Sequence, residues 1–263
     1  MTTLHIPELA PEKIFTIGSF AITNTMVNVW LAIVFFLVLG ILLRRKVSLR
    51  PGKLQNFLEY VLEGVLNTFD QVTADRKKTI KFLPIVGTIF FFVLISNWIG
   101  LLPGIGSITI GGHKELLRPA NTDLNLTVVM ALVAVIGSHI MGLFTVGVFA
   151  HIGKYIQLGG IVKSLKKGPI AIFAALIEFA VGLLEIVSEM AKVLSLSLRL
   201  FGNIFAGEVL IVVIRSLVAV VVPTPFMMLE LLVGLIQAAV FAILTLVYFT
   251  VATSEPHGAE EAH

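Results

Sequence analysis

The sequence predicts an all-α integral membrane protein with about five membrane helices, the last two of them long, and one amphipathic helix at the membrane surface. Two observations predict this class. Of the 263 residues, 57% are hydrophobic and 13% are charged, whereas soluble domains carry about 25% charged residues. The hydrophobic residues are gathered in runs of about 18 residues or more, the length at which a helix can cross the hydrocarbon core of a bilayer.

Charge pattern and cysteine content limit the function classes. The net charge of +3 comes from basic residues that flank the apolar runs, as topology determinants do, so nucleic acid is not expected as a partner. Zero cysteines exclude a disulfide framework and thiolate metal sites. We expect one helical membrane domain at residues 26–252, with neither a metal nor a cofactor.

The first part of the chain predicts one span and one surface helix. Residues 1–25 are mixed in composition and form an N-terminal external segment to which we assign no chemistry. Residues 26–43 form the first span, and three basic residues follow it directly. Because short cytoplasmic loops are rich in Lys and Arg, this pattern places the N-terminus outside. In residues 53–75, apolar side chains recur at helical spacing, which predicts an amphipathic helix on the inner membrane surface.

The next two spans are predicted at residues 82–102 and 124–150, joined by an external loop. Asn97 in the first is typical of a hydrogen bond between helices, and His139 in the second is more typical of a packed histidine than of a proton carrier. The two internal loops hold nine and four Lys or Arg residues, against three in the N-terminal segment and external loop together. This asymmetry supports the same orientation, with the polar C-terminal tail, 253–263, in the cytoplasm.

The last apolar region, 169–222, is too long for one upright helix. Its 54 residues would make a helix of about 81 Å, against a hydrocarbon core of about 30 Å. The region must therefore be steeply tilted, bent or folded back. Pro223 and Pro225 end it, and residues 226–252 form another long apolar element that completes a helical hairpin.

Charged residues inside these last two elements are the strongest functional signal. A charged side chain at the centre of a bilayer costs about 2.5–3.5 kcal/mol, and arginine cannot lose its proton to avoid this cost. Arg199 lies well inside the long apolar region. The charged residues between positions 169 and 252 are Glu178, Glu185, Glu189, Lys192, Arg199, Glu208, Arg215 and Glu230.

The spacing of these residues predicts two polar clusters on different sides of Arg199. At 3.6 residues per turn, one face of the long helix carries Glu178, Glu185, Glu189, Lys192, Arg199 and Asn203. Glu208 lies on about the opposite face, and Glu230 and Gln237 share a face of the last helix. If the long helix runs from inside to outside, Glu185 lies on the inner side of Arg199, and Glu208 and Glu230 lie on its outer side.

Two readings of this pattern stay open at this point. Two offset half-channels separated by a positive barrier would need an arginine between polar clusters that reach different membrane faces. The structural alternative is a set of internal ion pairs, such as Glu185–Lys192 and Glu208–Arg215. We favour the functional reading for Arg199 and the structural one for Lys192 and Arg215.

Four motifs resemble the subunit a family of the F-type ATP synthase membrane sector. The stretches 195-SLSLRLFGNIFAGE-208 and 237-QAAVFAILTLVY-248 match the family patterns SLxLRLFGNxxAGE and QAxxFxxLTxVY. Upstream, 87-GTIFFFVLISNWIGLLPG-104 and 118-RPANTDLNLT-127 are also similar to family patterns. The resemblance covers about residues 50–252.

This resemblance implies a stator subunit, not an enzyme by itself, beside a rotating ring of c subunits that each carry a carboxylate within the membrane. It implies that Arg199 attracts the ionised carboxylate and blocks a proton leak between two half-channels. The residues that match the outer half-channel are Asn203, Glu208, Gln237 and Glu230, the last standing where some members have histidine. Glu185 matches an acidic residue on the inner exit side, and Ser195 matches another family position.

Partners and location are also implied by the resemblance. We expect c-ring subunits, peripheral stalk b subunits, other ATP synthase subunits and lipid as partners, in a bacterial inner membrane. The family's last two helices are steeply inclined, and Val193 stands where many members have proline, which leaves a kink there open. Coupling to Na⁺ instead of H⁺ depends on the c subunit. An ion-coupled secondary transporter is the alternative, although it would usually show inverted repeats and broken helices.

Overall fold

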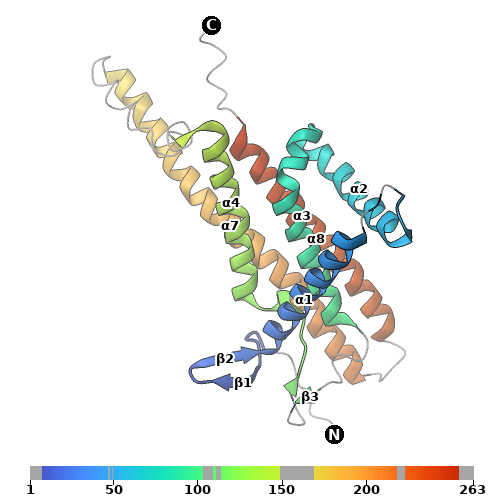
Figure 1. Ribbon diagram of the computed structural model, residues 1–263. Coiled ribbons are helices and arrows are strands. Elements are labelled where there is room, and N and C mark those ends of the chain that lie inside the picture. The colour runs from blue at the N-terminus through green and yellow to red at the C-terminus, as the bar shows by residue number, and fades with distance from the viewer. Residues whose placement is uncertain are drawn as a thin grey trace.

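The computed structural model describes residues 8–46, 48, 50–102, 109–110, 114–148, 169–217 and 223–254. Figure 1 shows a helical protein, in which the strands of the described residues form two short β-hairpins. The elements in chain order are β1 (Lys13–Ile17), β2 (Phe20–Thr23), α1 (Asn24–Lys46), α2 (Lys53–Thr73), α3 (Arg76–Leu101), β3 (Thr109–Ile110), β4 (Lys114–Glu115), the short 3₁₀ helix η2 (Ala120–Thr122), α4 (Leu124–Val146), α7 (Pro169–Leu217) and α8 (Pro223–Thr253). The predicted all-α class is confirmed.

Five helices of the described residues, α1, α3, α4, α7 and α8, are long and apolar enough to cross a membrane. The expectation of about five spans is therefore confirmed, and the chain is a multi-pass membrane protein. Helix α3 begins six residues before the span expected from hydropathy, because Asp75 caps it by accepting a hydrogen bond from the Lys77 backbone N–H (2.8 Å). Helix α8 begins at Pro223 instead of Phe226, since proline is tolerated in the first helical turn.

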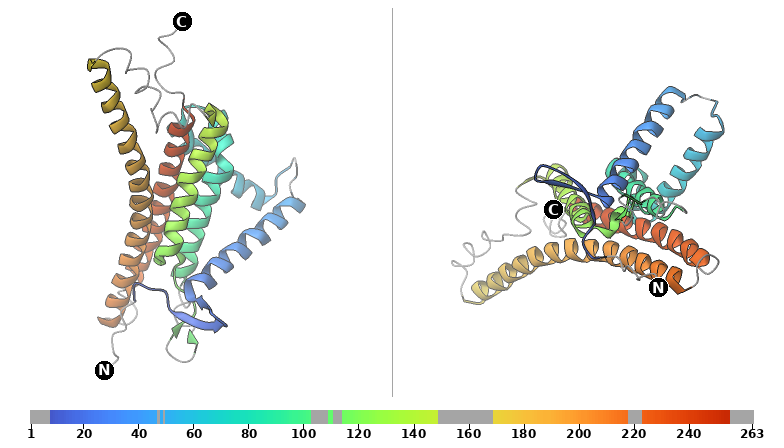
Figure 2. Two further views of the ribbon diagram at one scale, coloured as in Figure 1. Left: turned by 90° about the vertical axis from the view of Figure 1, so that its left-hand side faces the viewer. Right: turned by 90° about the horizontal axis from the view of Figure 1, so that it is seen from below.

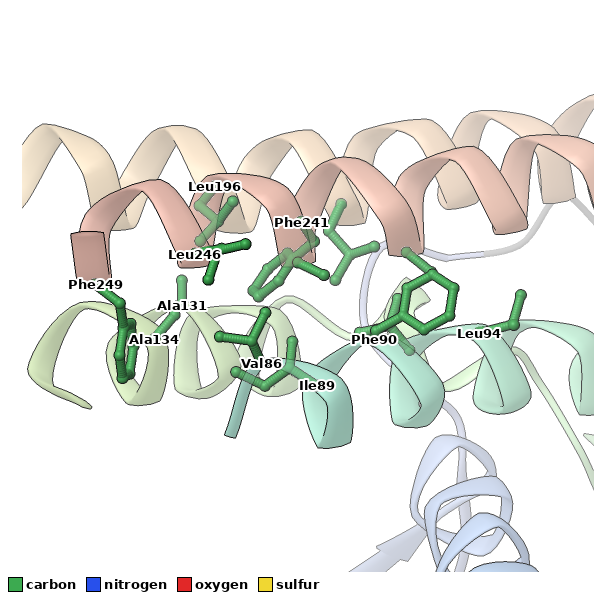
Figure 3. Close-up of a cluster of buried hydrophobic side chains, with 14 of the residues drawn as sticks. Val86, Ile89, Phe90, Leu94, Ala131, Ala134, Leu196, Phe241, Leu246 and Phe249 are labelled. Atoms are coloured by element: carbon green, nitrogen blue, oxygen red, sulfur yellow. The ribbon is translucent and has the colours of Figure 1, made fainter. Parts of the chain in front are cut away.

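Helices α3, α4, α7 and α8 form the bundle that holds the core. Their large buried side chains meet in one cluster, part of which is drawn in Figure 3. The rings of Phe82 on α3 and Phe249 on α8 lie edge to face, with centroids 5.5 Å apart. Small residues let the backbones approach: Ala131 and Ala134 of α4 and Ala238 of α8 are fully buried. Close van der Waals packing of this kind drives helix association in lipid.

Helix α7 is one continuous helix of 49 residues. At 1.5 Å per residue it is about 73 Å long, more than twice the hydrocarbon core of about 30 Å. It therefore cannot stand upright in a bilayer. It does not fold back on itself and stays helical through Val193, and it curves gently along α8 (Figure 2). The expected inner loop 151–168 and residues 218–222 lie outside the described residues.

Helices α1 and α2 project from one side of the bundle (Figure 2). Only 11% of the spanning window of α1 is buried. Its attachment is near its N-terminal end, where the Asn28 side-chain amide donates to the backbone oxygens of Ser96 (3.2 Å) and Arg118 (2.9 Å). Helix α2 packs on the bundle through Leu66 and Phe69, which are buried.

The end of the expected external loop is buried between the helices. Residues 117–122 are all buried, and the Asn121 side chain donates a 2.7 Å hydrogen bond to Asn97 Oδ1. Asn97 is therefore a hydrogen-bonded packing residue, as expected. Gly100 permits the close approach of this loop, since a Cβ at Gly100 would lie 2.5 Å from Pro119 Cα. The loop is thus fixed against α3 by sterics as well as by hydrogen bonds.

Gly100→Ala is expected to destabilise the protein by about 1–3 kcal/mol, because the added methyl group would displace the Pro119 backbone. The measurement is the thermal unfolding midpoint of purified protein in detergent. Gly40→Ala is the matched control: an added Cβ at Gly40 meets nothing within 4 Å, so the better helix propensity of alanine should leave stability equal or higher. Equal midpoints for the two variants would contradict the packing described for Gly100.

Candidate functional site

Arg199 lies on an exposed face of α7. Its guanidinium donates a hydrogen bond of 3.4 Å to Ser195 Oγ, one helical turn earlier. Asn203, one turn later, is also exposed, and the large apolar side chains Leu194 and Leu198 beside them are 58% and 52% exposed. A permanent cation thus stands on an apolar surface that the described residues do not cover. Such a surface needs a partner, because a charge facing lipid there is costly.

The other face of α7 packs into the bundle. Leu196, Leu200 and Ile204 are buried at spacings of four residues. Because α7 stays helical, nine residues from Arg199 to Glu208 amount to two and a half turns. Glu208 therefore faces inward while Arg199 faces outward. The opposite placement of these two residues follows the sequence expectation.

Glu208 forms a buried ion pair with Arg118. Arg118 Nε lies 2.8 Å from Glu208 Oε1 and 3.0 Å from Oε2. The side chains are 3% and 12% exposed, respectively. Arg118 comes from the buried loop before α4, 90 positions away in the sequence. The sequence suggested Arg215 as a candidate partner and indicated no role for Arg118, although Arg118 opens the motif 118-RPANTDLNLT-127.

Glu230 lies beside this pair. It is 5% exposed, and its Oε1 is buried with no hydrogen-bond partner among the described residues. Its carboxyl group occupies the space where a side chain at Gly207 would stand, so only glycine at position 207 allows α8 to approach in this way. Since Gly207 directly precedes Glu208, the structure brings the two carboxyl groups to one region of the α7–α8 interface.

Gln237 follows two turns further along the same face of α8. It is half-buried, between Gly234, which packs against Asn97, and the fully buried Ala238. The residues predicted to form the outer half-channel thus fall into two groups. Glu208, Glu230 and Gln237 lie inside the bundle or at its edge, whereas Asn203 lies on the exposed face with Arg199.

A second polar cluster lies nearer the start of α7. Glu189 accepts a 2.6 Å hydrogen bond from Lys192 Nζ and lies 3.3 Å from His139 Nε2 on α4. Lys192 also stands over the ring of Tyr248 on α8, 5.3 Å from its centroid. The pairing of Lys192 with Glu185 was therefore wrong: Glu189 and Lys192 are three positions apart and so are neighbours on the helix surface. Glu185 is half-exposed, and His139 is a packing residue that joins α4 to α7.

The two clusters lie toward opposite ends of the bundle (Figure 1). The cluster of His139, Glu189, Lys192 and Tyr248 lies toward the end of the bundle where α8 finishes. The group of Arg118, Glu208 and Glu230 lies toward the end that carries the β1–β2 hairpin. Arg199 lies between them along α7. The chain is therefore a multi-pass helical membrane protein with two internal polar clusters and an exposed cation, Arg199, between them.

Comparison with known proteins gives the family of this chain. The family model described as "ATP synthase A chain" matches residues 26–250. The ATP synthase subunit a of Geotalea daltonii is 32% identical over 249 residues, which are 95% of this chain and 94% of that protein. The subunit a proteins of Geobacter sulfurreducens, with 31% identity over 95% of this chain and 94% of the relative, and of Trichlorobacter lovleyi, with 30% identity over 90% of each, are similarly related. The chain belongs to the ATP synthase A chain family.

Proposed function

We propose that this chain is the proton-translocating stator subunit of a rotary ATP synthase. In this proposal, two offset half-channels separated by Arg199 load and unload the carboxylates of a rotating c-ring, and so couple proton flow to ATP synthesis in partner subunits. The chain itself performs no catalysis. The observation that carries the proposal is the exposed position of Arg199 in the middle of an apolar face of α7.

The mechanism follows from the energetics of a carboxylate in lipid. A protonated carboxyl group faces lipid at small cost, whereas an ionised one does not. Arg199 attracts the ionised form at the subunit interface only, and as a fixed cation it also repels a proton that would cross directly between the half-channels. Proton transport then requires the ring to turn, and each proton moved through 100 mV supplies about 2.3 kcal/mol.

The polar clusters supply the two routes. Glu208, Glu230, Gln237 and Asn203 form the outer route, and Glu185 with Ser195 lies on the inner side of Arg199. In this proposal the β1–β2 hairpin lies outside and the end of α8 in the cytoplasm, which the basic residues that flank the spans favour. Besides the c-ring, the partners in this proposal are the peripheral stalk b subunits and the bilayer of a bacterial inner membrane.

A cross-linking experiment tests the partner of the exposed face. The natural chain has no cysteine, so Asn203→Cys gives one site for a sulfhydryl-directed photo-cross-linker in the complete ATP synthase. We expect a covalent adduct with a c-ring subunit. Phe144→Cys is the control, since Phe144 is 84% exposed but lies on α4. An adduct of equal yield from both variants, or none from Asn203→Cys, would contradict the proposed interface.

A further inference from the structure

Arg118, in the buried loop before α4, contacts three other parts of the chain beside Glu208 and Glu230. Its Nε donates to both carboxylate oxygens of Glu208 on α7, and its Nη1 donates to the backbone oxygen of Ala10 in the N-terminal segment (3.4 Å). Its guanidinium carbon lies 5.6 Å from the ring centroid of Phe205, and its backbone oxygen accepts from Asn28 on α1. No feature of the proposed half-channels requires this residue, so its presence calls for its own explanation.

The surroundings hold the Arg118 backbone in place. Pro119, the next residue, lies against Gly100 of α3, and Asn121 is hydrogen-bonded to Asn97. A guanidinium on such a fixed loop is pre-organised, since little freedom of the loop is left to lose when the ion pair forms. The position of the Glu208 carboxylate is thereby determined from outside α7.

The two neighbouring carboxyl groups differ in what faces them. Glu208 faces a guanidinium that cannot lose its proton, and a buried ion pair of this kind is strongly destabilised when one partner loses its charge. The Glu230 carboxyl group lies against Gly207, the residue directly before Glu208. Its Oε1 is buried without a hydrogen-bond partner among the described residues. Other charged groups toward this end include Glu12, with one buried oxygen, Asp123, which accepts from Thr25, and the exposed Arg215 in the last turn of α7.

We infer that Arg118 is a positioning residue of the outer route: by holding Glu208 as a permanent carboxylate, it leaves Glu230 as the group that takes up and releases the transported proton. The step is a plain proton transfer. The Glu230 carboxylate binds one proton from outer water to become a carboxylic acid, passes it inward along the route, and returns to the carboxylate. Glu208 keeps its charge throughout. This inference rests on the proposed function.

The test is passive proton flux as a function of pH, measured with the membrane sector of the complete ATP synthase in vesicles. In Arg118→Gln, the uncompensated charge of Glu208 would make its neighbour Glu230 bind protons more tightly. A relay group that binds protons more tightly works fastest at a higher pH, so we expect the pH optimum to rise by about one unit. Arg118→Lys keeps the cation and should keep the optimum near that of the natural protein.

Two further variants separate this role from a structural one. In the double variant Arg118→Gln/Glu208→Gln, the charge that acts on Glu230 is gone, so the pH optimum should return to within a few tenths of a unit of the starting value. Arg215→Gln removes a different cation of α7, one that is exposed, and should leave the optimum unchanged. A uniform loss of flux in Arg118→Gln, with the optimum unmoved, would overturn the inference.

Failure of Arg118→Gln to assemble does not remove the test. In that case the variant Glu208→Gln tests the inference, and its amount in the membrane is the control for assembly. We expect this variant to keep at least about a tenth of the natural proton flux, because Glu230 carries the proton. Loss of all flux in an assembled Glu208→Gln overturns the inference. Absence of proton flux in vesicles of the natural protein would instead contradict the proposed function itself.

Discussion

Arg199→Ala is expected to abolish ATP-driven proton pumping while passive proton flux through the membrane sector persists or rises. In the proposed mechanism, loss of the guanidinium leaves an ionised ring carboxylate with no cation at the interface and leaves no fixed charge between the two polar clusters. An electrostatic contribution of about 3 kcal/mol corresponds to a change of about 100-fold. Pumping should fall by at least that factor, measured as ATP-driven acidification of vesicles that contain the complete complex.

The control for Arg199 is its exposed neighbour. Leu198→Ala removes apolar contact area from the same surface of α7 without removing charge, and should keep most of the pumping. The assay is run in sodium-free buffer, so that acidification also identifies H⁺ as the coupling ion; pumping that depends on added Na⁺ would identify the sodium-coupled version of the same subunit. Pumping by Arg199→Ala at close to the natural rate would show that the arginine has only a structural role and would contradict the half-channel mechanism.

Glu230→Gln is expected to lower both pumping and passive proton flux by about 100-fold, because an amide of nearly the same shape cannot carry a proton and proton transfer by a positioned group contributes about 10²–10⁴-fold. Glu230 is buried against Gly207, and the neighbouring Glu208 carboxylate is paired with Arg118, so we expect no other carboxyl group to take over its role. The loss of passive flux distinguishes this variant from Arg199→Ala, in which passive flux persists.

Glu230→His is the matched variant, since it restores a titratable side chain. It should recover part of the flux, with a pH dependence set by imidazole, which titrates near pH 6.5 when unperturbed. Glu178→Gln, an exposed carboxylate near the start of α7, is the negative control and should conduct normally. Normal flux in an assembled Glu230→Gln would exclude Glu230 from the outer route.

Local patterns in the sequence predict the fold and the faces of the long helices. The apolar runs predict the five spans, because the thickness of the bilayer fixes the length of a spanning segment. Helical periodicity places Glu208 opposite Arg199, since α7 stays regular over the nine residues between them. Such predictions succeed because they depend on residues that are near in sequence.

Contacts between distant segments could not be predicted in the same way. The partner of Glu208 lies 90 positions away, and helical spacing offers only Arg215 on its own helix. The pair Glu189–Lys192 is local, but its further contacts with His139 and Tyr248 come from α4 and α8. The role of Gly207 appears only when the Glu230 carboxyl group is placed against it. Each of these features is set by how the helices pack, which composition and periodicity do not specify.

The attachment of α1 near one end has a mechanical consequence for the proposed function. In that function, a subunit that guides a turning ring with one surface experiences torque and must pass that load to a fixed support through another surface. Helix α1 has the smallest buried share of the five candidate spans, and its side-chain hydrogen bonds to the bundle lie near one end, from Asn28 to Ser96 and Arg118 and from Thr25 to Asp123. An anchor that grips α1 would therefore transmit its restraint directly to the loop that holds Glu208.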